Sequence, residues 1–281
     1  MANHYIGRLA PSPTGLLHLG HARTFWIAHQ RARAASGQLL LRDEDLDPQR
    51  SRPEFSTAMK EDLQWLGITW AAEHRQSNRL PLYRAAMDKL LTAGLDYPCT
   101  CSRRDLAQST QAPHEEDDEP IYNGHCRDST PHRTLAANTN YRFRIPTTDP
   151  VAFTDLNAGP QSFTPDTDFG DFILWRKALS LDQPDGLPSY QLACVVDDAL
   201  TGITEVVRGR DLLKSTARQI LLQRALDYAT PAHFHTELMR DANGIRLAKR
   251  HDALSLRALR AQGFTPSDII AKFAIESRNT L

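Results

Sequence analysis

Two histidines three residues apart, His18 and His21, form the first candidate site in the sequence. They follow a turn-forming Pro-Ser-Pro-Thr-Gly stretch at 11–15 and stand where a helix is expected to begin. Residues at i and i+3 share one helix face, so both imidazoles can point the same way. The N–H groups and positive dipole end of a helix start favour phosphate, and Gly20 lets a flat ring approach the backbone. The context favours phosphate binding over two surface histidines on an amphipathic helix.

Two short clusters of metal-ligating residues form a second candidate site. Cys99 and Cys101 are separated by a long loop from a Tyr-Asn-Gly-His-Cys stretch that ends at Cys126. Paired ligands with a loop between the pairs are typical of structural zinc sites, which leave no open position for catalysis. From residue types alone, His125 is the candidate fourth ligand, and a zinc site is favoured over three unrelated thiols. Cys194 stands apart in an apolar run and is expected to be a buried strand residue.

The elements that must position these residues alternate between strands and helices. The N-terminal part predicts strands at 5–10 and 38–42, and helices at 16–35, from Pro53 onward and from about Pro81 to Gly94. From 96 to about 182 the chain is rich in turns, with strands expected at 142–145 and 151–153. The βα pattern then resumes with strands at 191–196 and 203–208, a helix at 211–228, and short helices at 255–261 and 267–277.

This order predicts an α/β fold in which a Rossmann-type parallel-sheet nucleotide-binding domain is split by a zinc-containing insertion. The two Rossmann halves are expected at 1–95 and 186–230, the insertion at 96–185, and a short helical C-terminal part at 231–281. A polar acidic segment at 115–119 within the insertion is expected to be a solvated loop.

Composition narrows the classes of protein. The chain has 281 residues, with 33 Lys+Arg against 34 Asp+Glu, so a polycation or an acidic disordered chain is excluded. Any nucleic-acid surface must therefore be a local patch. Four cysteines are too few for a disulfide scaffold. The polar N-terminus predicts no signal peptide and no apolar run approaches the roughly 20 residues of a membrane span, so a cytoplasmic protein is expected.

The sequence resembles glutamyl-tRNA synthetases, which are class I enzymes with a HIGH signature. The resemblance rests on RLAPSPTG at 8–15 before the histidine pair, RDEDLDP at 42–48, VDD at 196–198, GITEVVRG at 202–209 and DLL at 211–213. Standard members carry a large anticodon-binding region, whereas this chain ends at Leu281, so it is most similar to the truncated paralogues that modify queuosine. The resemblance implies tRNA-independent activation of L-glutamate with ATP, and transfer of glutamate to queuosine at the wobble position of tRNA(Asp).

The resemblance also implies roles for single residues. It places glutamate against Arg8, Leu9, Ala10, Pro11, Ser12, Glu44, Tyr190 and Arg208, and ATP against His18, Gly20, His21 and Lys249. Guanidinium forks at Arg8 and Arg208 suit carboxylates, Glu44 can pair with the α-ammonium, and the Tyr190 phenol can donate a hydrogen bond. Glutamine lacks the side-chain charge that such a site binds, which can reject it by roughly 10⁴ or more. His18, His21 and Lys249 are expected to be catalytic, with Mg²⁺ neutralising the pyrophosphate.

Two further expectations follow from the resemblance. Lys249 lies in Arg246–Arg250, the counterpart of the KMSKS loop, where arginine and alanine replace one lysine and both serines. The fourth zinc ligand becomes Tyr122 in place of His125, so that Cys99, Cys101, Tyr122 and Cys126 hold one structural Zn²⁺.

The protein is expected to be a monomer. The alternatives are a shortened conventional glutamyl-tRNA synthetase and a non-catalytic relic that binds tRNA or zinc.

Overall fold

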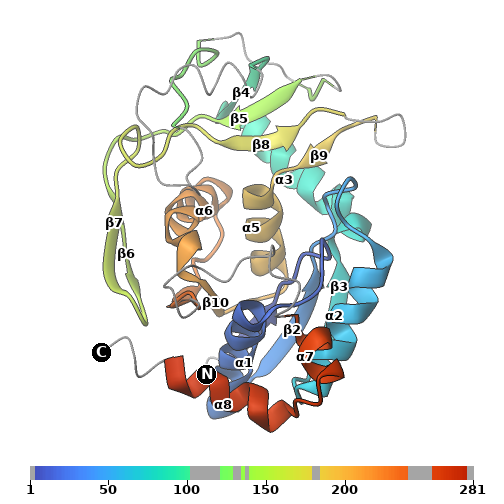
Figure 1. The fold of residues 1–281 in the computed structure, drawn as a ribbon. Helices are drawn as coiled ribbons and strands as arrows, with labels where there is room; N and C mark the ends of the chain where they lie inside the picture. Colours follow the sequence, from blue (N-terminus) through green and yellow to red (C-terminus); the bar gives the residue numbers. More distant parts are fainter. Residues whose placement is uncertain are drawn as a thin grey trace. The chain divides into compact units, whose positions relative to one another are not determined.

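The structure is a computed structural model that describes residues 4–101, 121–128, 134–136, 139–178, 184–239 and 255–276. The described residues divide into two compact units, drawn from 1–78, 203–210 and 231–281 and from 79–202 and 211–230. Figure 1 shows the elements of both units along the chain. The domain boundaries expected from the sequence stay a prediction.

The first unit is built on parallel strands. Strands β1 (Ile6–Leu9), β2 (Gln38–Asp43) and β3 (Ala72–Arg75) pair in this order, and β10 (Glu205–Gly209) pairs in parallel with β11 (Ala232–Thr236). The backbone N–H of Thr204 donates to the carbonyl of Ile6 at 2.8 Å, which places β10 beside β1. The expected parallel α/β organisation is therefore confirmed in this unit.

The helices of the first unit pack their apolar side chains against these strands. They are α1 (Leu19–Ala34), α2 (Pro53–Trp65), α7 (Leu256–Ala261) and α8 (Pro266–Glu276). A proline opens α2 at the position where its missing N–H costs nothing. Where α1 turns into β2, a Cβ on Gly37 would lie 2.4 Å from the Tyr5 carbonyl oxygen, so only glycine fits there. The core includes Leu9, Leu19, Ala22, Leu41, Met59 and Leu63.

The second unit combines antiparallel strands with three helices. Strands β4 (Asp96–Cys99), β5 (Asn140–Phe143), β8 (Ile173–Arg176) and β9 (Leu187–Pro188) form one sheet, and β6 (Val151–Asp155) pairs with β7 (Gly159–Phe163) as a hairpin. The helices are α3 (Leu80–Thr92), α5 (Tyr190–Leu200) and α6 (Leu213–Leu226). Within the described ranges, no helix combines the length and the apolar composition that crossing a membrane requires.

The strand expected at 191–196 is wrong, because these residues belong to helix α5. The Oγ of Ser189 accepts the backbone N–H of Leu192 at 3.3 Å and so caps the start of this helix. Residues 191–198 are all buried, so the run lacks the polar face that marks an amphipathic helix. The short apolar run at 192–196 within it does not distinguish a buried strand from a buried helix. Cys194 is buried as expected, but it lies in a helix.

Buried charge explains one of the sequence blocks in this unit. Asp197 on α5 is fully buried, and its carboxylate accepts hydrogen bonds from Arg79 at 2.7 Å and from the Tyr83 hydroxyl at 2.9 Å. These contacts join α5 to α3 and to the residue that precedes it. The aspartate of the VDD block is therefore a structural residue, whose loss would leave the half-buried Arg79 and the buried Tyr83 hydroxyl without this acceptor.

Candidate functional site

The two histidines lie together at the start of α1, with their ring centroids 3.8 Å apart and the ring planes at 28°. His18 is the N-cap, and its Nδ1 accepts the backbone N–H of Gly20 at 3.1 Å. In the neutral ring the hydrogen therefore sits on Nε2. A Cβ on Gly20 would lie 3.0 Å from Cε1 of His18, so glycine makes room for this ring. Contact of either histidine with ATP stays a prediction.

The turn before α1 is fixed to the end of β2. The carbonyl of Pro11 accepts the backbone N–H of Glu44 at 3.0 Å, and the carbonyl of Pro13 accepts that of Arg52 at 3.0 Å. Leu9 and Pro11 are buried, Ala10 is half-buried and Ser12 is exposed. The chain thus brings residues 8–12 beside Glu44 at the carboxyl ends of two parallel strands, which is where α/β sheets bind ligands.

Two arginines have their side chains fixed at this edge of the first unit. Arg8 on β1 is 5% exposed and donates from Nη1 to the carbonyl of Val207 at 2.8 Å. Arg208 on β10 is 6% exposed and donates from Nε to Nε2 of His235 at 3.1 Å. Because β1 and β10 are neighbours, the structure brings these two guanidinium groups to adjacent strands.

Glu44 and its neighbours complete the edge. The Glu44 carboxylate accepts two hydrogen bonds from Arg42, at 3.1 Å from Nε and at 3.0 Å from Nη2. Asp43 is buried and pairs with Arg75 at 3.1 Å and with the Ser56 hydroxyl. These contacts anchor β2 to β3 and α2.

Other predicted site residues fall elsewhere. Tyr190 lies in the second unit, at the first position of α5, and is 41% exposed. Lys249, with the whole Arg246–Arg250 stretch, and the acidic segment at 115–119 lie outside the described residues.

His235 is a residue of this site that the sequence did not predict. It is fully buried and accepts a hydrogen bond from Arg208, and no strand was predicted at 232–236. The alternation His-Phe-His-Thr there was the available signal.

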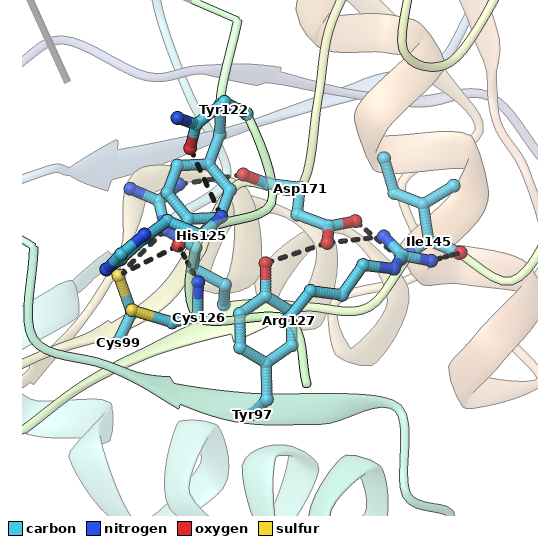
Figure 2. Close-up of polar contacts among 10 residues, drawn as sticks. Tyr97, Cys99, Tyr122, His125, Cys126, Arg127, Ile145 and Asp171 are labelled. Carbon is cyan, nitrogen blue, oxygen red and sulfur yellow. Dashed lines mark hydrogen bonds and ion pairs between the residues drawn. The ribbon is translucent and has the colours of Figure 1, made fainter. Parts of the chain in front are cut away.

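Three cysteines and a tyrosine form a compact donor set in the second unit, of which Figure 2 shows Cys99, Tyr122 and Cys126. The sulfurs of Cys99, Cys101 and Cys126 lie within 4.8 Å of one another, with 3.5 Å between those of Cys101 and Cys126. The Tyr122 hydroxyl lies 3.7 Å from the sulfurs of Cys99 and Cys101. A tetrahedral zinc with bonds of about 2.3 Å places neighbouring sulfurs about 3.8 Å apart, so this set fits such an ion.

Tyr122, and not His125, is the residue that the structure brings to the thiols. Its hydroxyl accepts the backbone N–H of Cys126 at 2.7 Å, and its side chain is buried. His125 is exposed, with its backbone N–H on Asn123 Oδ1 at 3.1 Å, and no imidazole of the described residues belongs to the sulfur group. The choice of His125 from residue types alone is therefore not supported, whereas the position of Tyr122 suits a ligand.

Burial and hydrogen bonds perturb the acidities in this cluster. Burial raises the pKa of the Cys101 thiol to about 11 and also raises the pKa of the Tyr122 phenol. Burial acts in the same direction on Cys126, but hydrogen bonds from Tyr122 and from the Thr100 backbone outweigh it and lower the pKa of Cys126 to about 6. A thiolate is the form that binds a metal, so the lowered pKa makes Cys126 easier to deprotonate than a free thiol.

A buried carboxylate holds the loop that follows Cys126. Asp171 accepts hydrogen bonds from the Tyr97 hydroxyl at 2.7 Å and the Ile145 backbone at 2.9 Å, and it pairs with Arg127. The second guanidinium nitrogen of Arg127 donates to the Ile145 carbonyl at 2.8 Å. Figure 2 shows this network beside the cysteines. The residue after Cys126 is thus tied to β4 and to the segment after β5.

The strand that carries Cys99 begins at a buried acid, which supplies a pH prediction. Asp96 is 1% exposed, and burial raises its pKa to about 6 although Arg144 opposes the shift. The folded state therefore binds more protons than the unfolded state between about pH 4 and pH 6, and stability falls as pH rises through that window. We expect Asp96→Asn to raise the free energy of unfolding at pH 7 by up to about 2 kcal/mol.

Denaturant unfolding at several pH values measures this effect. Asp88→Asn, at a 59% exposed side chain on α3, is the matched control and should leave both stability and its pH dependence unchanged. An Asp96→Asn protein with the wild-type pH profile would show that Asp96 is ionised normally in the folded state.

Comparisons with known proteins agree with this architecture. Residues 6–276 match the family described as tRNA synthetases class I (E and Q), catalytic domain. The chain is 45% identical to a glutamyl-Q tRNA(Asp) synthetase of Symbiobacterium thermophilum, covering 95% of this chain and 85% of the relative. It is 43% identical to the protein of the same name from Rhodobacter capsulatus, covering 94% of this chain and 98% of the relative.

The fold is also similar to a solved structure. A glutamate tRNA ligase from Elizabethkingia meningosepticum, crystallised in complex with its amino acid, superposes with a TM-score of 0.73 at 27% identity. The match covers 88% of this chain but 52% of the ligase, so the chain spans about half the length of that structure.

Proposed function

Because this chain belongs to the class I tRNA synthetases for glutamate and glutamine, we propose that it activates L-glutamate with ATP and transfers it to queuosine in tRNA(Asp). It is a ligase of the class I aminoacyl-tRNA synthetase type, and its relatives support glutamate–tRNA ligase activity. The proposal specifies that activation needs no tRNA, and that the acceptor is the queuosine base at the anticodon wobble position. Two relatives that bear the glutamyl-Q tRNA(Asp) synthetase name support this acceptor.

The observation that carries the proposal is the pair of buried guanidinium groups at the carboxyl edge of the parallel strands. Arg8 and Arg208 are both about 95% buried, and a neighbouring acid, Glu44, supplies negative charge. Glutamate has two carboxylates and one ammonium, so it matches two cations and one anion. Residues 9–12 line the turn beside them, and we assign Tyr190 a hydrogen bond to the same amino acid.

Activation then needs positioning and charge stabilisation from the protein. The α-carboxylate oxygen of glutamate bonds to the α-phosphorus of ATP, and the bond from that phosphorus to the bridging oxygen breaks to release pyrophosphate. His18 offers an Nε2–H donor at the positive end of α1, while Gly20 keeps the backbone open and His21 stacks on its partner ring. We assign Lys249 a contact with the phosphates of ATP. Mg²⁺, when bound, neutralises the pyrophosphate.

We further propose that Cys99, Cys101, Tyr122 and Cys126 hold one structural Zn²⁺. The fit of the donor set to a tetrahedron and the lowered pKa of Cys126 support this assignment. Such a closed set has no position for substrate, so the ion would act on folding of residues 96–185, which we propose as an insertion similar to an acceptor-binding domain. On this view 1–95 and 186–230 form the catalytic domain, and 231–281 carries the KMSKS-like sequence.

A glutamylation assay tests the proposed acceptor. The purified protein, radiolabelled glutamate and ATP are incubated with tRNA(Asp) bearing queuosine, with tRNA(Asp) lacking it, and with tRNA(Glu). We expect stable labelling of the queuosine-bearing tRNA(Asp) alone. Labelling of tRNA(Glu) instead would identify a shortened conventional glutamyl-tRNA synthetase and would refute the proposed acceptor.

ATP–pyrophosphate exchange without tRNA tests the activation step separately. Exchange that depends on glutamate supports the proposal, whereas exchange that appears only after tRNA(Glu) is added contradicts it. Binding of tRNA with no adenylate formation under any condition would identify the non-catalytic alternative.

A further inference from the structure

One arginine of the second unit contacts two donor residues of the cysteine–tyrosine cluster. Arg142 on β5 is 5% exposed, and its Nε donates to the Cys99 sulfur at 3.2 Å. The carbon at the centre of its guanidinium lies 3.7 Å from the centroid of the Tyr122 ring. We propose that Arg142 is the positioning and charge-balancing residue of the metal centre. This inference rests on the proposed zinc site and names a residue outside its ligand set.

The charge of the ligand set calls for such a group. Three thiolates and a phenolate carry four negative charges, and Zn²⁺ offsets two of them. The cluster is largely buried, with Cys99 1% and Tyr122 5% exposed, so its excess negative charge is poorly solvated. Arg142 places one positive charge against this excess without occupying a ligand position, because a guanidinium is a cation that donates hydrogen bonds and offers no lone pair to a metal.

The contacts of Arg142 also join the two halves of the ligand set. Cys99 belongs to the cysteine pair at the end of β4, and Tyr122 belongs to the segment that ends at Cys126. Because one planar guanidinium donates to the first and stacks on the second, it fixes their separation. Nη1 of Arg142 donates to the Asp171 carbonyl at 2.7 Å, which fixes the guanidinium itself. A lysine ammonium has no planar fork and would not make all three contacts.

The cation over the ring suits a tyrosine ligand in particular. A cation is attracted to the negative face of an aromatic ring, and a phenolate ring carries more negative charge than a phenol ring. The Arg142 guanidinium lies over the Tyr122 ring at 3.7 Å and would therefore balance the charge of a phenolate ligand. The arginine thus makes a tyrosine usable where a neutral imidazole would be the ordinary ligand.

Zinc affinity and the spectrum of the cobalt-substituted protein test this role. Arg142→Met keeps an unbranched apolar stem and removes the guanidinium with its charge and donors, and we expect it to weaken zinc binding about 10- to 100-fold in competition with a chromophoric chelator. In the Co²⁺ protein, loss of a cationic donor raises the energy of the thiolate electrons. The sulfur-to-cobalt charge-transfer band should therefore move to lower energy. Arg142→Lys should bind zinc with an intermediate affinity.

Arg144→Met is the matched control. Arg144 lies two residues after Arg142, directly beyond the end of β5. Its guanidinium carbon lies 4.9 Å from the centroid of the Tyr97 ring. Tyr97 contacts Asp171 and is not a proposed ligand. This variant should therefore keep the wild-type zinc affinity and cobalt spectrum. Equal losses in Arg144→Met and Arg142→Met would overturn the assigned role, because general destabilisation of β5 would then explain both.

Thermal unfolding with and without zinc separates positioning from folding. A smaller zinc-induced rise of Tm in Arg142→Met than in wild type supports the inference, and an equal rise overturns it. If Arg142→Met does not fold, Arg142→Lys decides, since wild-type zinc affinity together with an unshifted cobalt band in that variant would overturn the role. Failure of wild type to bind zinc at all would instead refute the metal centre itself, so the two failures are distinguishable.

Discussion

Substitution of Arg208 by glutamine is expected to lower kcat/KM for glutamate in ATP–pyrophosphate exchange by about 1,000-fold. The Arg208 guanidinium is 6% exposed and is oriented by His235, so its charge acts in a poorly solvated site. Removing one partner of such a buried charge pair costs about 2–5 kcal/mol, and 4 kcal/mol corresponds to this factor. Glutamine keeps a hydrogen-bond donor of similar reach, so the loss reports on charge. Steady-state exchange at varied glutamate concentration measures it.

Arg210→Gln is the control for this experiment. Arg210 lies two residues further along the chain, is 47% exposed and pairs with Glu237 at the surface. Exposed ion pairs contribute little, so its exchange activity should stay at the wild-type level. If Arg208→Gln retained wild-type kcat/KM for glutamate, the assignment of this arginine to the amino-acid substrate would be wrong.

Substitution of Cys126 by serine is expected to weaken zinc binding by at least about 100-fold and to lower the Tm of the zinc-loaded protein. Structural zinc contributes about 10–16 kcal/mol in small zinc-binding peptides, so loss of one ligand in four removes several kcal/mol. Cys126 is the thiol with its pKa lowered to about 6, so it contributes a thiolate at the smallest proton cost. Metal content after dialysis and chelator competition measure the change.

Two variants identify the fourth ligand in the same assay. Tyr122→Phe removes the phenolic oxygen and keeps a ring for Arg142, so a loss of zinc affinity isolates the coordinating atom. His125→Ala is the control, since His125 is exposed and its backbone N–H, which the substitution keeps, donates the hydrogen bond to Asn123. Full zinc retention in Tyr122→Phe would assign the position to His125 or water. A wild-type protein purified without chelator and free of zinc would contradict the centre as a whole.

Local signals in the sequence predicted the elements that surround the histidine pair. The turn at 11–15, the helix that follows it and the strand at 38–42 all exist within a few residues of their expected bounds. Each is marked by residues within its own segment, such as the prolines and glycine of the turn and the Gly37 that follows the helix. His18 is the N-cap with an extended backbone, so its stacking on His21 depends on the geometry of the cap as well as on the helix.

The features that sequence reasoning missed depend on contacts between distant residues. Residues 191–198 are buried on every side within helix α5. The apolar run they contain therefore has no period that would distinguish a helix from a strand. Residue types alone favoured His125 as a ligand, whereas the resemblance favoured Tyr122, whose hydroxyl the fold brings beside the thiols. The partner of Arg208 lies 27 residues away on a strand without a strong apolar pattern. No local rule links these pairs.

The hydrogen bonds between Ile6 and Thr204 span 198 positions of the chain. During synthesis at about 5–20 residues per second, strand β1 therefore leaves the ribosome roughly 10–40 s before its neighbour β10. Over that interval one edge of β1 has no strand to pair with, which is the kind of surface that recruits other chains. Completion of the first unit is thus a late event in biosynthesis, and the nascent N-terminal βαβ segment depends on protection until β10 arrives.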